Sequence, residues 1–176
     1  ATLEPALSER TKAVMVVHLA GSPCAMDEIT ALTEPRGIPI LEDAAQAHGA
    51  RYKGRRIGAH GDIVCWSFYP GKNLGALGDA GAVTTNHAAL AARVALLRNY
   101  GSRQKYVNEE AGVNSRLDPI QAAVLRVKLG VLNDWTARRR AVAAATFALL
   151  AVPGDDGGRG RVAPFGEVQL AAQQVR

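Results

Sequence analysis

Three side chains that can do chemistry lie at or just after the ends of two expected strands. Asp43 ends the strand that begins at Ile38, Ser67 ends the strand 63–67, and Lys72 follows five residues later in a glycine-flanked loop. In open α/β sheets, ligand sites gather at the carboxyl ends of strands. We therefore expect a carboxylate, a hydroxyl and an amine to lie close together.

This combination of groups suits pyridoxal phosphate. An amine forms an imine with the cofactor, a carboxylate keeps the pyridine nitrogen protonated so that the ring is an electron sink, and a hydroxyl with backbone amides holds the phosphate. Taken singly, an Asp at a strand end is more often a cap or turn residue, and a lone Ser or Lys is more often structural or solvated. Lys72 is harder to explain as surface, because Gly71, Leu74, Gly75 and Ala76 surround it. The residues alone leave a cofactor site and an ordinary loop about equally open.

The apolar pattern predicts the elements that must position these side chains. The run 13–18 is almost continuously apolar, which predicts a strand buried on both faces, as in a parallel sheet. A helix is expected over 26–36, with Pro35 ending it and Gly37 beyond its cap. Strand, helix and strand in this order predict a βαβ unit. The other expected elements are strands over 38–43, 63–67 and 82–85 and a helix over 87–98.

A long helix is expected near the end of the chain. Asp118 suits its N-cap and Pro119 its first position, and it is expected to reach Leu150. The sequence thus predicts a partial cofactor-binding large domain over 1–117, a connecting helix over 118–153, and a divergent, disordered tail over 154–176. The apolar stripe of the helix is predicted to contain Ile120, Val124, Val127, Val131 and Trp135.

Composition argues against several classes of protein. The chain has 176 residues, of which 48% are hydrophobic and 21% charged, as in soluble globular proteins. A net charge of +5 would suit a nucleic acid, but the basic residues are scattered and aromatics make up only 5%, so we expect no nucleic-acid partner. No apolar run approaches the ~20 residues that span a bilayer, so we expect no membrane partner. The two cysteines form neither a disulfide framework nor a metal-spaced cluster, which favours no metal, free buried thiols and a cytoplasmic location.

Several short motifs follow one another in a specific order: EDAAQAHG at 42–49, SFYPGKN at 67–73, GDAGAV at 78–83, NYGSR at 99–103, and NSRLD at 114–118 followed by QAA at 121–123. In order and spacing they resemble the signatures of the DegT/DnrJ/StrS family of pyridoxal-phosphate-dependent nucleotide-sugar aminotransferases. The resemblance covers about residues 1 to 150. It implies an α/β protein with the three-layer α/β/α fold of type I PLP-dependent transferases, of which this chain is part of the large domain.

The resemblance also implies a role for each matching residue. Lys72 matches the catalytic lysine that carries the cofactor as a Schiff base and moves the proton between cofactor and substrate carbons. Asp43 matches the partner of the pyridine nitrogen, and Gln46 matches the side chain beside the ring and its phenolic oxygen. Ser67 matches a phosphate ligand from the same chain. Asn114 matches a phosphate ligand from the neighbouring subunit, which implies a homodimer with shared active sites.

The remaining polar positions carry weaker expectations. His18 either lies near the cofactor or simply terminates a strand, and His48 is expected to be structural, with its ring satisfied by nearby backbone. Arg103, Lys105 and Arg116 are candidates for contacts to the substrate's diphosphate or to the other subunit.

The implied reaction is transamination of a keto nucleotide-sugar with glutamate as the amino donor. The loop 101–106 resembles that of enzymes that aminate C3 of a dTDP-keto-hexose in macrolide amino-sugar pathways. A C4 aminotransferase stays open, whereas Lys72 argues against the dehydratases of the family, which replace this lysine with histidine. A regulatory or inactive member, or a gene fragment, is the other alternative, because the chain begins at Ala1 and family members are about twice as long. The resemblance implies that the absent parts supply a phosphate-binding turn and a ring-stacking aromatic, so we expect weak or no activity from this chain alone.

Overall fold

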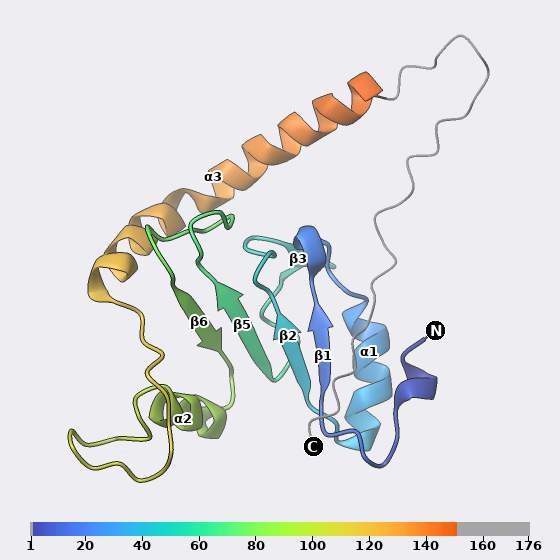
Figure 1. Ribbon diagram of the computed structural model, residues 1–176. Coiled ribbons are helices and arrows are strands. Elements are labelled where there is room, and N and C mark those ends of the chain that lie inside the picture. Colours follow the sequence, from blue (N-terminus) through green and yellow to red (C-terminus); the bar gives the residue numbers. More distant parts are fainter. Residues whose placement is uncertain (1, 151–176) are drawn as a thin grey trace.

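The computed structural model describes residues 2–150, which form a four-stranded mixed sheet flanked by helices (Figure 1). The strand order is β1-β2-β5-β6, in which β1, β2 and β5 are parallel and β6 runs antiparallel to β5. The three parallel strands therefore end at the same edge of the sheet, which is the upper edge in Figure 1. The strands are β1 (Val14–Val17), β2 (Ile40–Asp43), β5 (Ile63–Ser67) and β6 (Gly81–Thr84), and a separate hairpin pairs β3 (Arg51–Tyr52) with β4 (Arg55–Arg56).

Helix α1 (Met26–Thr33) joins β1 to β2 and completes the βαβ unit that the sequence predicted. It ends where Pro35 enters a 3-10 turn, η3 (Glu34–Arg36), and Gly37 then adopts the left-handed conformation with φ 62°. Helix α3 begins at Pro119, as expected, while the predicted tail at 154–176 lies outside the described residues. No helix within residues 2–150 has both the length and the apolar character needed to cross a membrane. The other helical segments are α2 (Ala88–Leu97), α3 (Pro119–Leu150), η1 (Glu4–Ala6) and η2 (Leu19–Gly21).

One face of the sheet is buried. Successive side chains of a strand point to opposite faces, so Val14 and Val16 of β1 share a face. Both are buried against Met26 and Ile29 of α1. The registers that pair Val16 with Glu42 and Glu42 with Val64 continue this face across the sheet. A second buried cluster extends the core under β5 and consists of Ala44, Ala47, Ile57 and Val64.

The opposite face is open within the described part of the chain. Met15 of β1 is 45% exposed and Val83 of β6 is 42% exposed. The prediction that β1 is buried on both faces is therefore wrong for residues 2–150. The apolar run correctly indicated a strand of a parallel sheet, but no described element packs against its Met15 side.

Helix α3 crosses the carboxyl edge of the sheet and packs with a different face from the predicted one (Figure 1). Leu125 and Leu132, two turns apart, are buried against Leu74 and Ala76 of the loop between β5 and β6. The helix carries apolar residues on several sides, so its sequence pattern did not single out the packed side. Three residues of the predicted stripe are largely exposed instead: Ile120 at 73%, Val127 at 75% and Val131 at 43%.

Candidate active site

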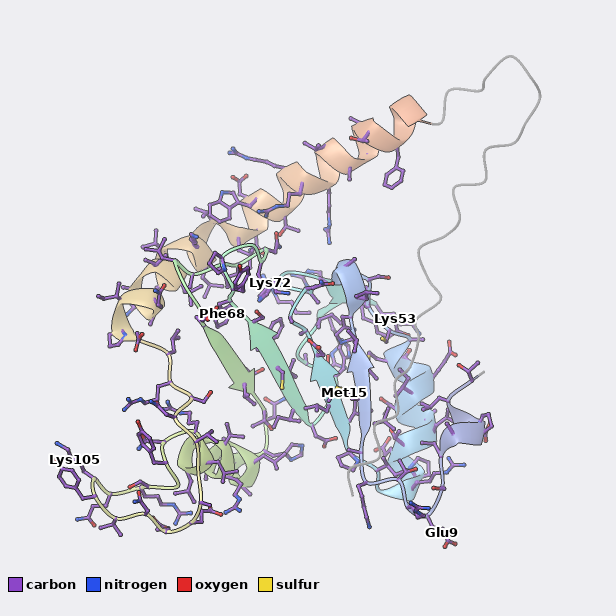
Figure 2. All side chains as sticks on the ribbon, in the orientation of Figure 1. Glu9, Met15, Lys53, Phe68, Lys72 and Lys105 are labelled. Carbon is purple, nitrogen blue, oxygen red and sulfur yellow. The ribbon has the colours of Figure 1, made fainter. Side chains whose placement is uncertain are left out.

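Three of the side chains predicted to hold a cofactor, those of Asp43, Ser67 and Lys72, belong to strand ends or a loop at the carboxyl edge of the sheet. Asp43 is the last residue of β2 and Ser67 the last residue of β5. Because Asp43 pairs with Cys65, Asp43 and Ser67 point to the same, open face. The loop 68–80 leaves β5 and enters β6 at this edge and carries the half-buried Lys72 (Figure 2).

A hollow of about 220 Å³ lies on the open face beside Asp43 and Ser67, and Lys72 is not among the residues that line it. The amide of Ala45 donates to Oδ1 of Asp43 at 3.0 Å, which holds the carboxylate at the end of the strand. Sequence reasoning did not single out Ala45, whose small side chain leaves room beside the carboxylate. The hollow is lined by Met15, Leu41, Glu42, Asp43, Ala45, Cys65, Trp66 and Ser67.

The pKa of Cys65, which lines the hollow, is raised by its surroundings. Burial raises the pKa of its thiol, and the nearby negative charge of Asp43 raises that pKa further. The thiol is therefore held in its neutral form. Cys65 is only partly buried, unlike Cys24, so the expectation of two buried thiols is half right.

The loop that carries Lys72 is tightly folded on its own backbone. The amide of Lys72 donates to the Tyr69 carbonyl at 2.8 Å, and the amide of Ala76 donates to the Phe68 carbonyl at 2.7 Å. A Cβ at Gly75 would collide with the Pro70 carbonyl, so this close approach requires glycine.

Neighbouring elements also hold this loop. From α3, Nζ of Lys128 donates to the Gly75 carbonyl at 2.7 Å, and Oε1 of Gln121 accepts the amide of Leu77 at 2.8 Å. From the segment after β2, the His48 carbonyl accepts Nδ2 of Asn73 at 2.8 Å. Lys72 is thus presented by a backbone that is fixed on both sides.

His48 lies buried beside the lysine loop, in an environment that sequence reasoning did not foresee. Its ring packs near the rings of Trp66 and Phe68, with centroid separations of 5.4 and 5.7 Å. Within the described residues neither ring nitrogen has a hydrogen-bond partner, so the prediction that nearby backbone satisfies this ring is wrong. Burial and the positive charge of Lys72 lower the pKa of His48; the backbone of Ser67 opposes this only weakly, without hydrogen-bond geometry.

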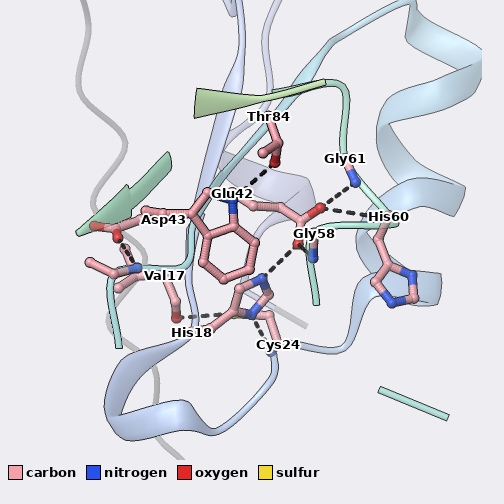
Figure 3. A network of polar contacts seen from close by, with 11 residues as sticks. Val17, His18, Cys24, Glu42, Asp43, Gly58, His60, Gly61 and Thr84 are labelled. Carbon is pink, nitrogen blue, oxygen red and sulfur yellow. Dashed lines mark hydrogen bonds and ion pairs between the residues drawn. The ribbon is translucent and has the colours of Figure 1, made fainter. Parts of the chain in front are cut away.

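On the buried face, His18 and Glu42 form a fully buried pair (Figure 3). His18 Nε2 and Glu42 Oε2 are 2.9 Å apart, and the carboxylate also accepts backbone amides from Gly58, His60 and Gly61. Burial raises the pKa of Glu42, but His18 and these amides outweigh it and lower that pKa overall, so Glu42 is an anion. The sequence signal that was missed is an acidic residue at a strand position facing the core.

His18 does more than terminate β1. Burial lowers its pKa, but the contacts with the side chain of Cys24 and with Glu42 outweigh burial and raise that pKa. The amide of Cys24 donates to Nδ1 at 3.2 Å, a contact that requires this nitrogen to be unprotonated and therefore opposes the rise. A neutral ring whose Nε2–H donates to Glu42 while Nδ1 accepts from Cys24 satisfies both contacts, so the geometry favours this tautomer.

Four of the predicted residues lie away from this site. Asn114 is exposed and forms an isolated bridge with Asn99, and Arg103 pairs with Glu109 at 3.2 Å. Lys105 lies at the opposite end of the molecule from Lys72 (Figure 2). Arg116 packs over the ring of Tyr100, 5.5 Å from its centroid. These residues belong to the segment between α2 and α3, which lies on the β6 side of the sheet in Figure 1.

A mixed sheet with a carboxylate and a loop lysine at the carboxyl ends of its strands is the architecture of pyridoxal-phosphate-dependent transferases of fold type I, and the solved structures that this chain resembles are aminotransferases of that fold. The chain belongs to the DegT/DnrJ/EryC1/StrS aminotransferase family, whose model matches residues 1–154. The expected fold class and family are therefore confirmed.

Individual relatives are similar over most of this chain. A dTDP-3-amino-3,4,6-trideoxy-alpha-D-glucose transaminase of Streptomyces venezuelae is 56% identical over 153 residues, covering 86% of this chain. The erythromycin biosynthesis sensory transduction protein EryC1 of Saccharopolyspora erythraea is 56% identical over 147 residues, covering 81%. The crystal structure of S. venezuelae DesV in complex with a ketimine intermediate has a TM-score of 0.83 and covers 86% of this chain and 41% of its own. The chain spans 40% of the length of these two curated relatives.

Proposed function

We propose that this chain forms the cofactor-binding part of a pyridoxal-phosphate-dependent aminotransferase that aminates a keto nucleotide-sugar. The substrate class is a dTDP-3-keto-deoxyhexose, with glutamate as amino donor, in deoxyamino-sugar and antibiotic biosynthesis in the cytoplasm. The observation that carries this proposal is the position of Lys72, on a rigid loop at the same sheet edge as the carboxylate of Asp43.

The residues of the hollow fit this cofactor. Asp43 supplies an anion for the pyridine nitrogen, Ala45 leaves space for the flat ring, and Ser67 supplies a hydroxyl for the phosphate. When bound, pyridoxal phosphate supplies an electron sink that stabilises negative charge on the carbon from which a proton is removed.

Each residue then has a distinct task. Lys72 holds the cofactor covalently through Nζ and carries a proton at the same atom, and Asp43 keeps the pyridine nitrogen protonated. Gln46, which is exposed, would lie beside the ring and its phenolic oxygen. The positive charge of Lys72 and the burial of His48 keep the imidazole neutral, so His48 adds no second cation next to the amine.

The segment between α2 and α3 serves a second copy of the chain in this proposal. Asn114 supplies a phosphate ligand to the neighbouring subunit of a homodimer, and Arg103, Lys105 and Arg116 face the substrate's diphosphate or that subunit. All four residues are exposed and none lines the hollow, which supports a role outside their own chain's site.

The test is to trap the cofactor on the purified chain. We expect added pyridoxal phosphate to give a visible absorption band, and borohydride reduction followed by peptide mapping to place the label on Lys72. The matched variants are Lys72→Ala, which should lose the band and the label, and Lys53→Ala, which removes an exposed lysine paired with Asp27 and should keep both. A label distributed over surface lysines, or one that survives in Lys72→Ala, would contradict the proposal.

A regulatory member of the family is the second candidate, and the observation that favours it is the similarity to EryC1, which is named a sensory transduction protein. The two candidates differ in amino transfer. Formation of 2-oxoglutarate from glutamate supports the aminotransferase. Cofactor binding without it supports the regulatory member only for a protein of the full length of these relatives, because weak or no activity is expected from this chain alone. Assays on 3-keto and 4-keto sugar nucleotides then separate a C3 enzyme from a C4 enzyme.

A further inference from the structure

The turn η2, which follows β1, has an unusual backbone. Its central residue, Ala20, adopts a left-handed conformation with φ 52° and ψ 22°, which non-glycine residues rarely occupy. Such a conformation persists where the surrounding structure holds it, and it often marks a functional site. The left-handed residue directs its amide to Oε1 of Gln46, at 2.7 Å. A Cβ on the neighbouring Gly21 would lie 3.3 Å from the Gln46 carbonyl, so the turn packs closely on the backbone as well.

His18 is the residue that holds this turn in place (Figure 3). Its backbone amide donates to the Asp43 carbonyl at 3.1 Å, and its ring pairs with Glu42 at 2.9 Å, so it is fixed to the end of β2 twice. Its Nδ1 accepts the amide of Cys24 at 3.2 Å, and its carbonyl accepts the amide of Gly21 at 3.1 Å. The ring of His18 therefore links Cys24 to Glu42, and its backbone amide holds the start of the turn against Asp43.

We propose that His18 is a positioning residue that fixes the turn Leu19–Gly21, and that this turn orients the side chain of Gln46 next to Asp43. The inference rests on the proposed function, because Gln46 matters only if a ligand lies beside it.

The hydrogen bond from Ala20 fixes the orientation of the Gln46 side chain and also decides which of its polar atoms can contact a ligand. Its side chain is exposed and has three rotatable bonds, so on its own it would sample many rotamers. Because Oε1 is engaged by Ala20, the group that Gln46 presents to a ligand is its NH2. That group is a hydrogen-bond donor and suits an anionic oxygen such as a phenolate.

Amide hydrogen exchange of Ala20 tests this in the 176-residue chain without any cofactor. Gln46→Ala removes the acceptor and sets the reference rate, expected to be about fivefold faster than wild type. His18→Gln keeps a donor within reach of Glu42 but loses the acceptor for Cys24, and we expect it to accelerate Ala20 exchange by a similar factor. His18→Asn keeps an acceptor for the Cys24 amide and should restore much of the protection. The amide of Ala44, which bonds to the Cys65 carbonyl at 2.9 Å, reports whether the sheet is intact.

The inference is wrong if His18→Gln leaves Ala20 exchange at the wild-type rate while Gln46→Ala accelerates it. It is also wrong if Ala44 and Ala20 accelerate together in both His18 variants, because His18 would then act only on global stability. Should His18→Gln not fold, His18→Asn decides, since its Ala20 amide must exchange more slowly than that of Gln46→Ala. Pyridoxal phosphate uptake by the wild-type chain is measured separately: no uptake with His18-dependent exchange overturns the proposed function alone, and uptake with His18-independent exchange overturns this inference alone.

Discussion

The imidazole of His48 is buried, and neither of its nitrogens has a hydrogen-bond partner among residues 2–150, so protonation of this ring would be especially costly. Its flat faces pack near Trp66 and Phe68, and the positive charge of Lys72 adds to burial in lowering its pKa. The neutral ring therefore packs as an aromatic side chain between the segment after β2 and the loop that carries Lys72. The unpartnered nitrogens cost free energy even in the neutral ring, and protonation would add the larger cost of a buried charge.

The resulting prediction is a loss of stability in mild acid that His48→Phe removes. A histidine whose folded pKa is depressed contributes stability that is present above its unfolded pKa, about 6.5, and is lost as pH falls through the folded value. Between about pH 7 and pH 5 we expect the free energy of unfolding of wild type, measured by urea titration, to fall relative to that of His48→Phe. The raised pKa of His18 gives a slope of opposite sign, which the two proteins share. Glu42 does not confuse this comparison, because its lowered pKa places its own loss below its unfolded value of 4.5. Equal slopes for the two proteins would show that His48 does not titrate in this range.

At the scale of elements, α3 acts as a brace for the lysine loop. Leu125 and Leu132 pack on Leu74 and Ala76, and Lys128 between them on the same side of the helix bonds to the Gly75 carbonyl. The helix therefore stabilises the loop that presents Lys72 and contributes no predicted catalytic group of its own.

Removing the packed face of α3 should weaken the chain, whereas removing its exposed face should not. We expect Leu125→Ala to lower the free energy of unfolding by about 2–4 kcal/mol, the usual cost of deleting a buried leucine. Val127→Ala, at a position that is 75% exposed, should change it by no more than about 0.5 kcal/mol. Chemical denaturation of both variants makes the measurement. A larger effect for Val127→Ala than for Leu125→Ala would mean that the predicted stripe is the packed one after all.

The comparison of sequence and structure is clearest at this scale. Element ends were predictable because they depend on local chemistry: Pro35 and Gly37 end α1, and Pro119 begins α3. The packed side of α3 was not predictable, because an alanine- and valine-rich helix has no single apolar face and tertiary contacts choose one. Tertiary contacts also decide how many faces of a strand are buried, so the apolar run of β1 led to the wrong expectation that both of its faces are buried.

For the candidate site, the sequence located the side chains that matter but not what holds them. Strand ends brought Asp43, Ser67 and the Lys72 loop to one edge, as the α/β pattern predicts, while their roles toward a cofactor stay predictions. The buried pair of His18 and Glu42 was missed, because contacts between residues 24 positions apart follow from strand register, which the sequence shows only indirectly.

At the scale of the whole molecule, the sheet is asymmetric: one face is buried under α1, and the other carries the hollow and exposed apolar side chains. Neighbouring residues of β1 lie on opposite faces of the sheet. Val16 is fully buried, whereas its neighbour Met15 is 45% exposed. Substitutions on the face buried under α1 should therefore lower the free energy of unfolding, whereas substitutions on the open face should change it little.

A pair of neighbouring substitutions measures this asymmetry. Val16→Ala removes buried methyl groups and should lower the free energy of unfolding by about 2 kcal/mol, because the lost burial is not recovered by collapse of a close-packed core. Met15→Thr keeps a residue that suits a strand and should change the free energy by no more than about 0.5 kcal/mol if its side chain is in water. A cost near that of Val16→Ala would mean instead that the open face is covered in solution. Sedimentation at several protein concentrations would then identify self-association as the cause, since a face buried between copies makes stability depend on concentration.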